Sequence, residues 1–179
     1  MSGGLFVNAL ARETGHSLSE GEVARIMQLH SEAYRNYASQ VRPLPGAREL
    51  LAYLAEQHVP HAIATSGYRD SAAHALAALG ASPDLPIVTR DQVAHAKPDP
   101  DLFLAAAARL GIPVEDCVVV GDSIWDLLAA RRARALSIGL LSGGYGQEEL
   151  ERAGAYRIYQ DPADLLAHLD EVGVRSEQK

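Results

Sequence analysis

The sequence predicts an α/β fold in which helices flank a doubly wound, mostly parallel sheet. From residue 47 onward, short apolar segments alternate with helix-period segments at the spacing of strand–helix–strand units. The first forty residues show helical periodicity and no strand pattern. Two prolines and a glycine between Pro43 and Gly46 separate the two parts, because neither a helix nor a central strand tolerates that composition. We therefore expect a small helical subdomain over residues 1–42 and an α/β core over residues 43–179.

The helices are predicted from apolar periodicity and from the capping residues at their ends. Ser19 followed by Glu22 is a capping-box pattern, which predicts a helix over residues 20–38 after a shorter one that ends near Gly15. Aspartate followed by proline, at Asp99 and again at Asp161, predicts an N-cap and a first-turn proline. We expect core helices over 47–54, 70–79, 99–110, 123–133, 147–153 and 161–172, strands over 62–64, 87–89, 117–120, 136–141 and 156–159, and a frayed tail over 175–179.

Composition and charge exclude several classes of partner. The 179 residues hold 16 basic and 23 acidic side chains, for a formal net charge of −7. This acidic balance disfavours binding to nucleic acid and to anionic membranes, and no apolar run approaches the roughly 20 residues that span a bilayer. The first residues lack a secretory signal pattern and the single cysteine, Cys117, cannot form an internal disulfide, so we expect a cytoplasmic protein. A phosphate ligand would need a local basic group or a divalent cation.

Polar side chains follow three of the predicted strands, and ligands of doubly wound sheets bind beyond the carboxyl ends of the strands. The first place is Thr65-Ser66-Gly67, where hydroxyl and backbone N–H groups are suited to a phosphoryl oxygen. The alternative is a Ser/Thr turn that caps the next helix. The second place is Lys97, which precedes Pro98 and is therefore expected to be extended. The alternative is a solvated loop lysine, since lysine is seldom buried.

The third place is the run from Val118 to Asp126, in which an apolar strand ends in glycine and aspartate. Gly121 permits a tight turn, and Asp122 projects a carboxylate of the kind that Mg²⁺ prefers. An acidic group directly after a buried strand is energetically costly without a partner, so a purely structural role does not explain an aspartate at position 122. Asp126 has one, because with Ser123 it forms a capping-box pattern at the positive end of a helix dipole. A cap and a metal site both remain open for Asp126.

In this order, the three places resemble the motifs of the haloacid dehalogenase superfamily, in its phosphoglycolate phosphatase-like and beta-phosphoglucomutase-like branch. The family's second motif is a strand that ends in Thr or Ser, matched by Thr65. The third is a lysine commonly followed by proline, matched by Lys97-Pro98, and the fourth is GDxxxD, matched by Gly121 to Asp126. The resemblance covers essentially the whole chain. It implies a Rossmann-like core, with residues 1–42 as the later part of a small helical cap.

One motif of the family does not occur in the 179 residues. This first motif, DxDGT or DxDxT after an apolar strand, carries the nucleophilic aspartate and the acid/base aspartate. In the family it precedes the cap, so we expect it upstream of Met1 and the chain to be a fragment or a truncated product. Its strand lies between those that end at Thr65 and Asp122, so two apolar strand edges are expected to be unpaired. A partner chain is another source of the strand, which leaves a monomer or a strand-exchanged homodimer open.

The resemblance also implies an activity and residue roles. The expected reaction is Mg²⁺-dependent hydrolysis of a small phosphorylated metabolite through an aspartyl-phosphate. Thr65 and Ser66 would bind the phosphoryl group, and Lys97 would offset its charge. Asp122 would ligate Mg²⁺ directly, and Asp126 would ligate it through water or orient the site. The alternatives are a non-catalytic binding domain that lacks its nucleophile, a phosphomutase and a 2-haloacid dehalogenase, and the substrate stays open.

Two further features, an arginine cluster and a glycine-rich run, are not assigned to a binding site. Arg131, Arg132 and Arg134 cluster near the end of a predicted helix, where a solvated cationic face suits the helix dipole better than nucleic-acid binding does. The run from Ser142 to Gly146 is glycine-rich but too generic to predict a phosphate-binding loop.

Overall fold

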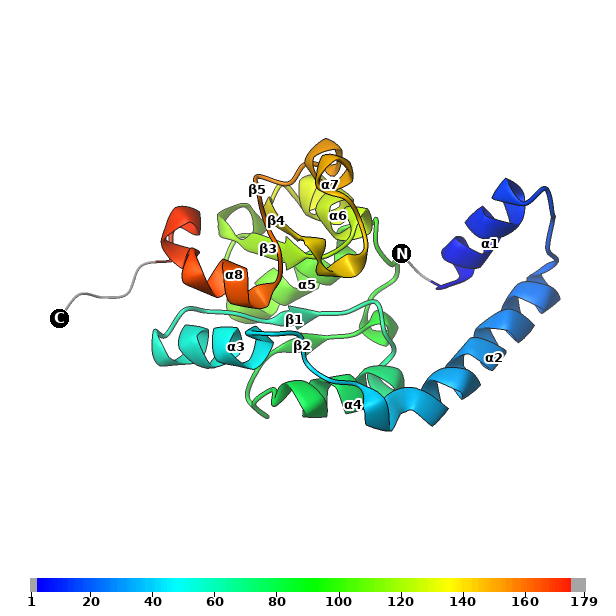
Figure 1. Cartoon of the computed structure of the whole chain (residues 1–179), viewed down its shortest axis with the longest axis horizontal. Helices are drawn as coiled ribbons and strands as arrows, with labels where there is room; N and C mark the ends of the chain where they lie inside the picture. Colours follow the sequence, from blue (N-terminus) through cyan, green and yellow to red (C-terminus); the bar gives the residue numbers. More distant parts are fainter. Residues whose placement is uncertain (1–2, 175–179) are drawn as a thin grey trace.

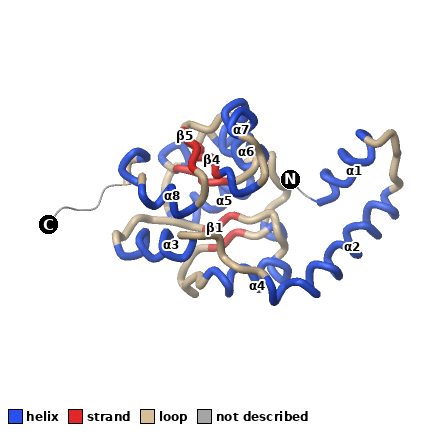
Figure 2. The backbone as a smooth tube through the Cα atoms, in the orientation of Figure 1, coloured by secondary structure: helices blue, strands red, loops and turns tan. Residues whose placement is uncertain are grey.

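Two parallel sheets form the centre of the protein, as a computed structural model that describes residues 3–174 shows (Figures 1 and 2). Strand β1 (Ile63–Ala64) pairs with β2 (Ile87–Val88), with Ile63 opposite Ile87. The second sheet has the order β3-β4-β5, formed by β3 (Val118–Gly121), β4 (Leu136–Leu140) and β5 (Arg157–Tyr159). The predicted α/β class with parallel strands is confirmed, and each strand lies within two residues of its expected bounds.

Eight α-helices occur in the described residues. The predicted capping box is present, because Ser19 N–H donates to a carboxylate oxygen of Glu22 at 2.8 Å while its side chain accepts from the Glu22 N–H. Gly111 has a φ of +68°, which permits the left-handed turn that ends α5. The helices are α1 (Gly3–Glu13), α2 (Glu20–Tyr37), α3 (Ala47–Glu56), α4 (Arg69–Leu79), α5 (Asp101–Leu110), α6 (Ile124–Ala133), α7 (Gln147–Ala153) and α8 (Pro162–Ala167).

Two predicted helix ends are wrong. Asp99 does not cap α5, because the first N–H groups of the helix, those of Phe103 and Leu104, donate to the carbonyl of Pro100, and the helix begins at Asp101. The terminal helix ends at Ala167 and is followed by a 3₁₀ turn. His168 interrupts it, since its ring Nδ1 lies 2.8 Å from the Asp164 carbonyl that would otherwise accept the next helical N–H. Residues 175–179, predicted as a frayed tail, lie outside the described residues.

Helices cover both faces of the sheets. On one face, α5 packs against both sheets, with Leu102 against Val88 of β2 and Phe103 against Val119 of β3. On the other face, α3 and α8 lie side by side, and Leu165 of α8 packs with the side chains of β4 and β5. The result is a three-layer α/β/α core whose helices bridge the two sheets.

A cleft separates β1 from β3. Within the described chain these strands are not hydrogen-bonded to each other, and a cavity of about 450 Å³ lies between them. Its lining is mainly apolar and includes Ala64 of β1, the β3 valines, and side chains from α3, α5 and α8. Val118 and Val120 of β3, the edge strand beside this cleft, remain 42% and 44% exposed, so the unpaired edge presents apolar side chains. We call this space the strand cleft, since it lies where the resemblance places a further strand.

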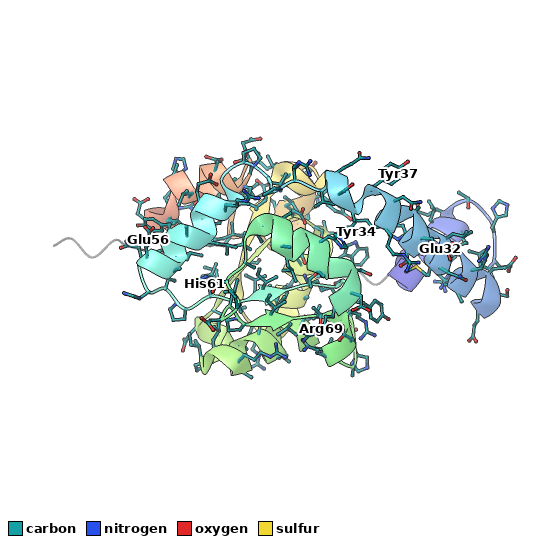
Figure 3. The ribbon with its side chains drawn as sticks, turned by 90° about the horizontal axis from the view of Figure 1, so that it is seen from below. Glu32, Tyr34, Tyr37, Glu56, His61 and Arg69 are labelled. Atoms are coloured by element: carbon teal, nitrogen blue, oxygen red, sulfur yellow. The ribbon has the colours of Figure 1, made fainter. Side chains whose placement is uncertain are left out.

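The helices α1 and α2 form an arm that projects from the body (Figure 1). No described residue of α2 is buried, and Tyr37, at its inner end, is 62% exposed. Figure 3 shows Glu32 and Tyr34 on this arm and His61 within the body, beside the start of β1. Among residues 3–174, no helix has the length and apolar character needed to cross a membrane.

Candidate active site

Lys97 is buried, and so the solvated alternative for this lysine is wrong. Only 8% of the residue is exposed. Its ammonium donates to the carbonyl of Ala64 at 3.1 Å and lies 2.7 Å from Oδ1 of Asp126. The same group lies 5.0 Å from the ring centroid of Phe103, a cation–π distance. The lysine therefore connects the carboxyl end of β1 to the first turn of α6.

Asp126 has the capping role that its sequence context allows, and its carboxylate also pairs with Lys97. Its backbone N–H donates to the Ser123 side chain at 3.4 Å, which makes Ser123 the N-cap of α6. In turn the Ser123 hydroxyl donates to Oδ2 of Asp126 at 2.7 Å, while Oδ1 faces Lys97. The Asp126 side chain is 11% exposed, and a Cβ placed on Gly121 would lie 2.3 Å from the Asp126 Cβ. A glycine at position 121 is thus required for Asp126 to lie here.

Asp122 lies between these groups and solvent, at the end of β3. Burial raises the pKa of its carboxyl group, and the neighbouring charge of Asp126 raises it further. A backbone hydrogen bond and the charge of Lys97 lower this pKa, without reversing the shift. Lys97 forms its ion pair with Asp126, so an ionised Asp122 adds a negative charge that no ion pair in the described residues balances. A divalent cation with oxygen ligands fits that charge.

The residues after β1 form the turn that was one of the two alternatives. The Thr65 side-chain oxygen accepts from the Gly67 N–H at 3.1 Å, so the Ser/Thr turn is present. This bond uses a lone pair, so the Thr65 O–H proton remains available to a ligand. The Ser66 hydroxyl is buried and has no hydrogen-bond partner within residues 3–174. A buried hydroxyl of this kind is suited to a ligand oxygen.

Lys97, Asp122 and Asp126 lie close enough to interact, and Lys97 also contacts the carboxyl end of β1, directly before Thr65 and Ser66. The lysine links these segments, because its ammonium touches the carbonyl before Thr65 and the carboxylate of Asp126. The described residues contain no group of three or more histidine, cysteine, aspartate or glutamate side chains that could hold a metal ion. Any metal here would need further oxygen ligands besides Asp122 and Asp126.

Two contacts of the site have no counterpart in the sequence-based expectations. Gly143, in the run set aside as generic, packs on Asp122: a Cβ there would lie 1.9 Å from the Asp122 carbonyl oxygen. Arg132, expected on a solvated face, donates to the Pro98 carbonyl at 3.0 Å. Both contacts join segments far apart in sequence, so local patterns could not indicate them.

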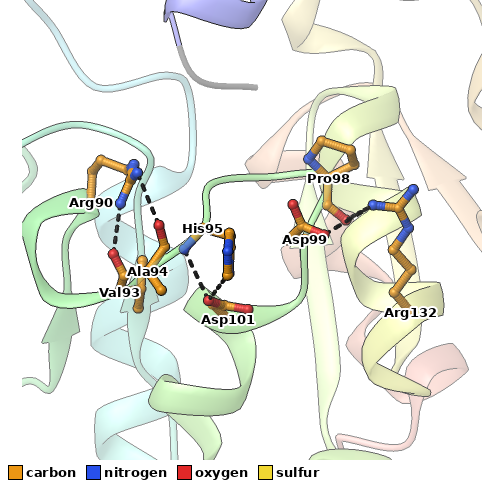
Figure 4. Close-up of polar contacts among 8 residues, drawn as sticks. All are labelled: Arg90, Val93, Ala94, His95, Pro98, Asp99, Asp101 and Arg132. Atoms are coloured by element: carbon orange, nitrogen blue, oxygen red, sulfur yellow. Dashed lines mark hydrogen bonds and ion pairs between the residues drawn. The ribbon is translucent and has the colours of Figure 1, made fainter.

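The loop that carries Lys97 is held by side chains on both sides (Figure 4). The Arg90 guanidinium donates to the carbonyls of Val93 and Ala94 at 2.7 and 3.2 Å. The carboxylate of Asp101 accepts from the backbone N–H of His95 at 2.9 Å and lies 3.0 Å from its ring Nδ1. His95 therefore anchors the loop rather than taking part in the cluster around Lys97.

The geometry agrees with one class of protein. A sequence model of the family described as haloacid dehalogenase-like hydrolase matches residues 5–134. The chain therefore belongs to the haloacid dehalogenase-like hydrolase family, which confirms the family inferred from the order of the motifs.

Individual relatives agree with this assignment. A phosphoglycolate phosphatase of Rhodospirillum rubrum is 33% identical over 122 residues, which cover 68% of this chain and 50% of that protein. The crystal structure of a hydrolase from Pseudomonas syringae is 52% identical, with a TM-score of 0.92 over 97% of this chain and 80% of that one. A HAD family hydrolase from Deinococcus radiodurans R1, solved with bound phosphate and sodium, is 30% identical, with a TM-score of 0.72 over 93% and 75%. The chain spans about half the length of several curated relatives that it matches.

Proposed function

We propose that this chain is the larger part of a Mg²⁺-dependent phosphomonoester hydrolase that acts through an aspartyl-phosphate. The observation that carries the proposal is the buried Lys97–Asp126 pair, 2.7 Å apart, whose charges also act on Asp122, directly after β3. Charged groups at such a place are costly to bury and are typical of functional sites. The phosphatase relative and the phosphate bound in the Deinococcus radiodurans hydrolase support phosphate as the group recognised.

The residues after β1 would bind the phosphoryl oxygens. The Thr65 hydroxyl donates one hydrogen bond, and the Ser66 hydroxyl, which has no partner in the described chain, donates another. Lys97, whose ammonium binds the carbonyl of Ala64 directly before Thr65, would offset the charge of the phosphoryl group and of the attacking carboxylate. Since the protein is acidic overall, this buried cation supplies the local positive potential that a phosphate needs.

Asp122 would hold the magnesium ion, and Asp126 would orient Lys97. Both carboxylate oxygens of Asp126 already have protein partners, the Lys97 ammonium and the Ser123 hydroxyl. Asp122 is half-buried, and its pKa is raised because burial disfavours its negative charge. It is therefore a better direct ligand for the ion than Asp126 is. Mg²⁺ bound there would neutralise charge on the phosphoryl oxygens.

The nucleophile would come from a strand seated in the strand cleft. The 179 residues contain no DxDGT or DxDxT motif. A parallel strand between β1 and β3 would cover the exposed Val118 and Val120, and its carboxyl end would emerge beside Thr65 and Asp122. That is where an attacking aspartate must lie to reach a phosphoryl group bound by these residues. A longer form of the same polypeptide would supply this strand within one chain, or would exchange it with a second copy of that longer form in a strand-exchanged dimer.

The experiment is to supply that strand. An apolar strand followed by Asp-x-Asp-Gly-Thr is fused upstream of residue 1 through a flexible Gly/Ser linker, which gives what we call the complemented chain. We expect it to hydrolyse p-nitrophenyl phosphate with Mg²⁺, and the unmodified chain to be inactive. Changing the first aspartate of the added motif to asparagine is the matched control and should abolish turnover, since covalent catalysis needs that carboxylate.

Two outcomes would contradict the proposal. If Asp122→Asn leaves the Mg²⁺-dependent rate of the complemented chain unchanged, Asp122 is not the metal ligand. If the unmodified chain turns over phosphomonoesters at a rate that survives Lys97→Ala and Thr65→Ala, the reaction takes place elsewhere. Halide release from a 2-haloacid without metal would instead indicate a dehalogenase.

A further inference from the structure

The position of Lys97 is set by tertiary contacts, because residues 93–100 lie outside helices and strands. On the amino side of the lysine, Arg90 and Asp101 bind backbone groups of the loop from nearby positions in the sequence. On its carboxyl side, Arg132 reaches the loop from α6, 34 residues further along the chain. Figure 4 shows these contacts on either side of the loop.

The helix α6 therefore contacts the lysine loop at both of its ends. Asp126, in its first turn, holds the ammonium of Lys97, and Arg132, in its last turn, holds the carbonyl of the next residue, Pro98. Six residues of helix separate the two contacts, about 9 Å along the axis. The side chain and the backbone of the lysine segment are thus attached to one rigid element, the helix that follows Asp122.

We propose that Arg132 is a positioning residue for Lys97. The inference rests on the proposed function, in which the place of the ammonium matters for phosphoryl transfer. Arg132 positions the loop through its hydrogen bond to the Pro98 carbonyl, at 3.0 Å, and the charge of the guanidinium donor strengthens this bond. The contact to Asp99 is weaker: the distance is 3.4 Å, and the two side chains are 53% and 48% exposed to screening by water and salt.

The sequence offers a direct probe of this inference, because Lys97 and Lys179 are its only lysines. In a Lys179→Arg background, reductive methylation of lysine reports on Lys97 alone, and its rate is measured by mass spectrometry of the peptide that contains it. The buried ammonium reacts only when the loop opens, so the rate measures how firmly the loop is held.

We expect Arg132→Ala to raise the methylation rate of Lys97 about fivefold, the change that corresponds to a lost hydrogen bond of about 1 kcal/mol. Arg131→Ala is the matched control: it removes the same charge at the neighbouring exposed position of the same helix. Its rate should equal that of the parent chain. Arg132→Lys keeps one donor and should restore part of the protection.

The outcomes separate this inference from the proposed function. Equal rates in Arg132→Ala and Arg131→Ala, at equal melting temperatures, would overturn the inference whatever the chain catalyses. In the complemented chain, Arg132→Ala should lower kcat for p-nitrophenyl phosphate more than it changes KM, because it displaces Lys97 without removing it. If the methylation rates differ as expected but the complemented chain is inactive, the proposed function fails and the contact still holds Lys97 in place.

Discussion

The ammonium of Lys97 lies 2.7 Å from Oδ1 of Asp126, and each side chain is only about a tenth exposed. Removing one member of such a pair leaves the other charge buried without a partner. We expect Lys97→Met to lower the free energy of unfolding by about 3–5 kcal/mol, the range for a broken buried ion pair. Urea denaturation measures it. The double variant with Asp126→Asn should lose clearly less than the sum of the two single losses, and strict additivity would contradict the pairing.

A second prediction concerns the charge of Asp122. Burial and the charge of Asp126 raise its pKa, so the folded protein binds this proton more tightly than the unfolded chain does. Stability is therefore lost as the pH rises from the ordinary pKa of aspartate through the raised one. In the absence of Mg²⁺, Asp122→Asn should raise the melting temperature at neutral pH. The difference from the parent chain should vanish below about pH 4, where both carry a neutral side chain.

We expect added magnesium to reverse the order of these two melting temperatures. An ion that binds only the folded state raises its melting temperature, so Mg²⁺ should stabilise the parent chain. Asp122→Asn, which lacks the ligand, should not respond. The same increase in both proteins would place the ion away from Asp122.

A third prediction concerns Gly143. A Cβ at this position would lie 1.9 Å from the Asp122 carbonyl oxygen and 2.8 Å from its Cγ, so Gly143→Ala must displace Asp122. We expect a loss of about 1–3 kcal/mol in unfolding free energy, typical of overpacking, together with a weaker response to Mg²⁺. Gly146→Ala is the control from the same loop, because its backbone is extended, with φ −74°, and only a flexible Glu149 oxygen lies near, at 3.5 Å. Equal responses to Mg²⁺ in the two variants would show that Asp122 does not depend on Gly143.

The sequence predicted those parts of the site that depend on local patterns. Gly121, Asp122 and Asp126 lie within six residues, and strand, tight turn and helix cap are each encoded there. Thr65 follows an apolar strand, and its turn needs only the next two residues. Because the carboxyl ends of parallel strands meet at one edge, the fold class alone brings these segments together.

Local sequence patterns could not predict the contacts between segments that are far apart in the chain. Asp99 has the sequence context of an N-cap, but the N-cap is Pro100, and the Asp99 carboxylate lies 3.4 Å from Arg132, 33 residues away. Lysine is rarely buried, and nothing near Lys97 in the sequence indicates that Asp126 and the Ala64 carbonyl will surround it. The sequence around Gly143 is that of an ordinary glycine-rich turn, and only the folded structure places this glycine against Asp122.

Amide hydrogen exchange tests most directly whether a further strand occupies the strand cleft between β1 and β3. Ile63 and Thr65 donate their N–H groups toward β2, at 2.9 Å to the carbonyls of Pro86 and Val88, so the intervening Ala64 N–H is directed toward the cleft. Exchange is compared between the unmodified and the complemented chain, for peptides covering β1 and β3. We expect the amide protons of Ala64 and of the β3 segment to exchange much more slowly in the complemented chain, while those of α2, on the arm, exchange at the same rate in both chains. Equal exchange of β1 and β3 in the two chains would contradict it.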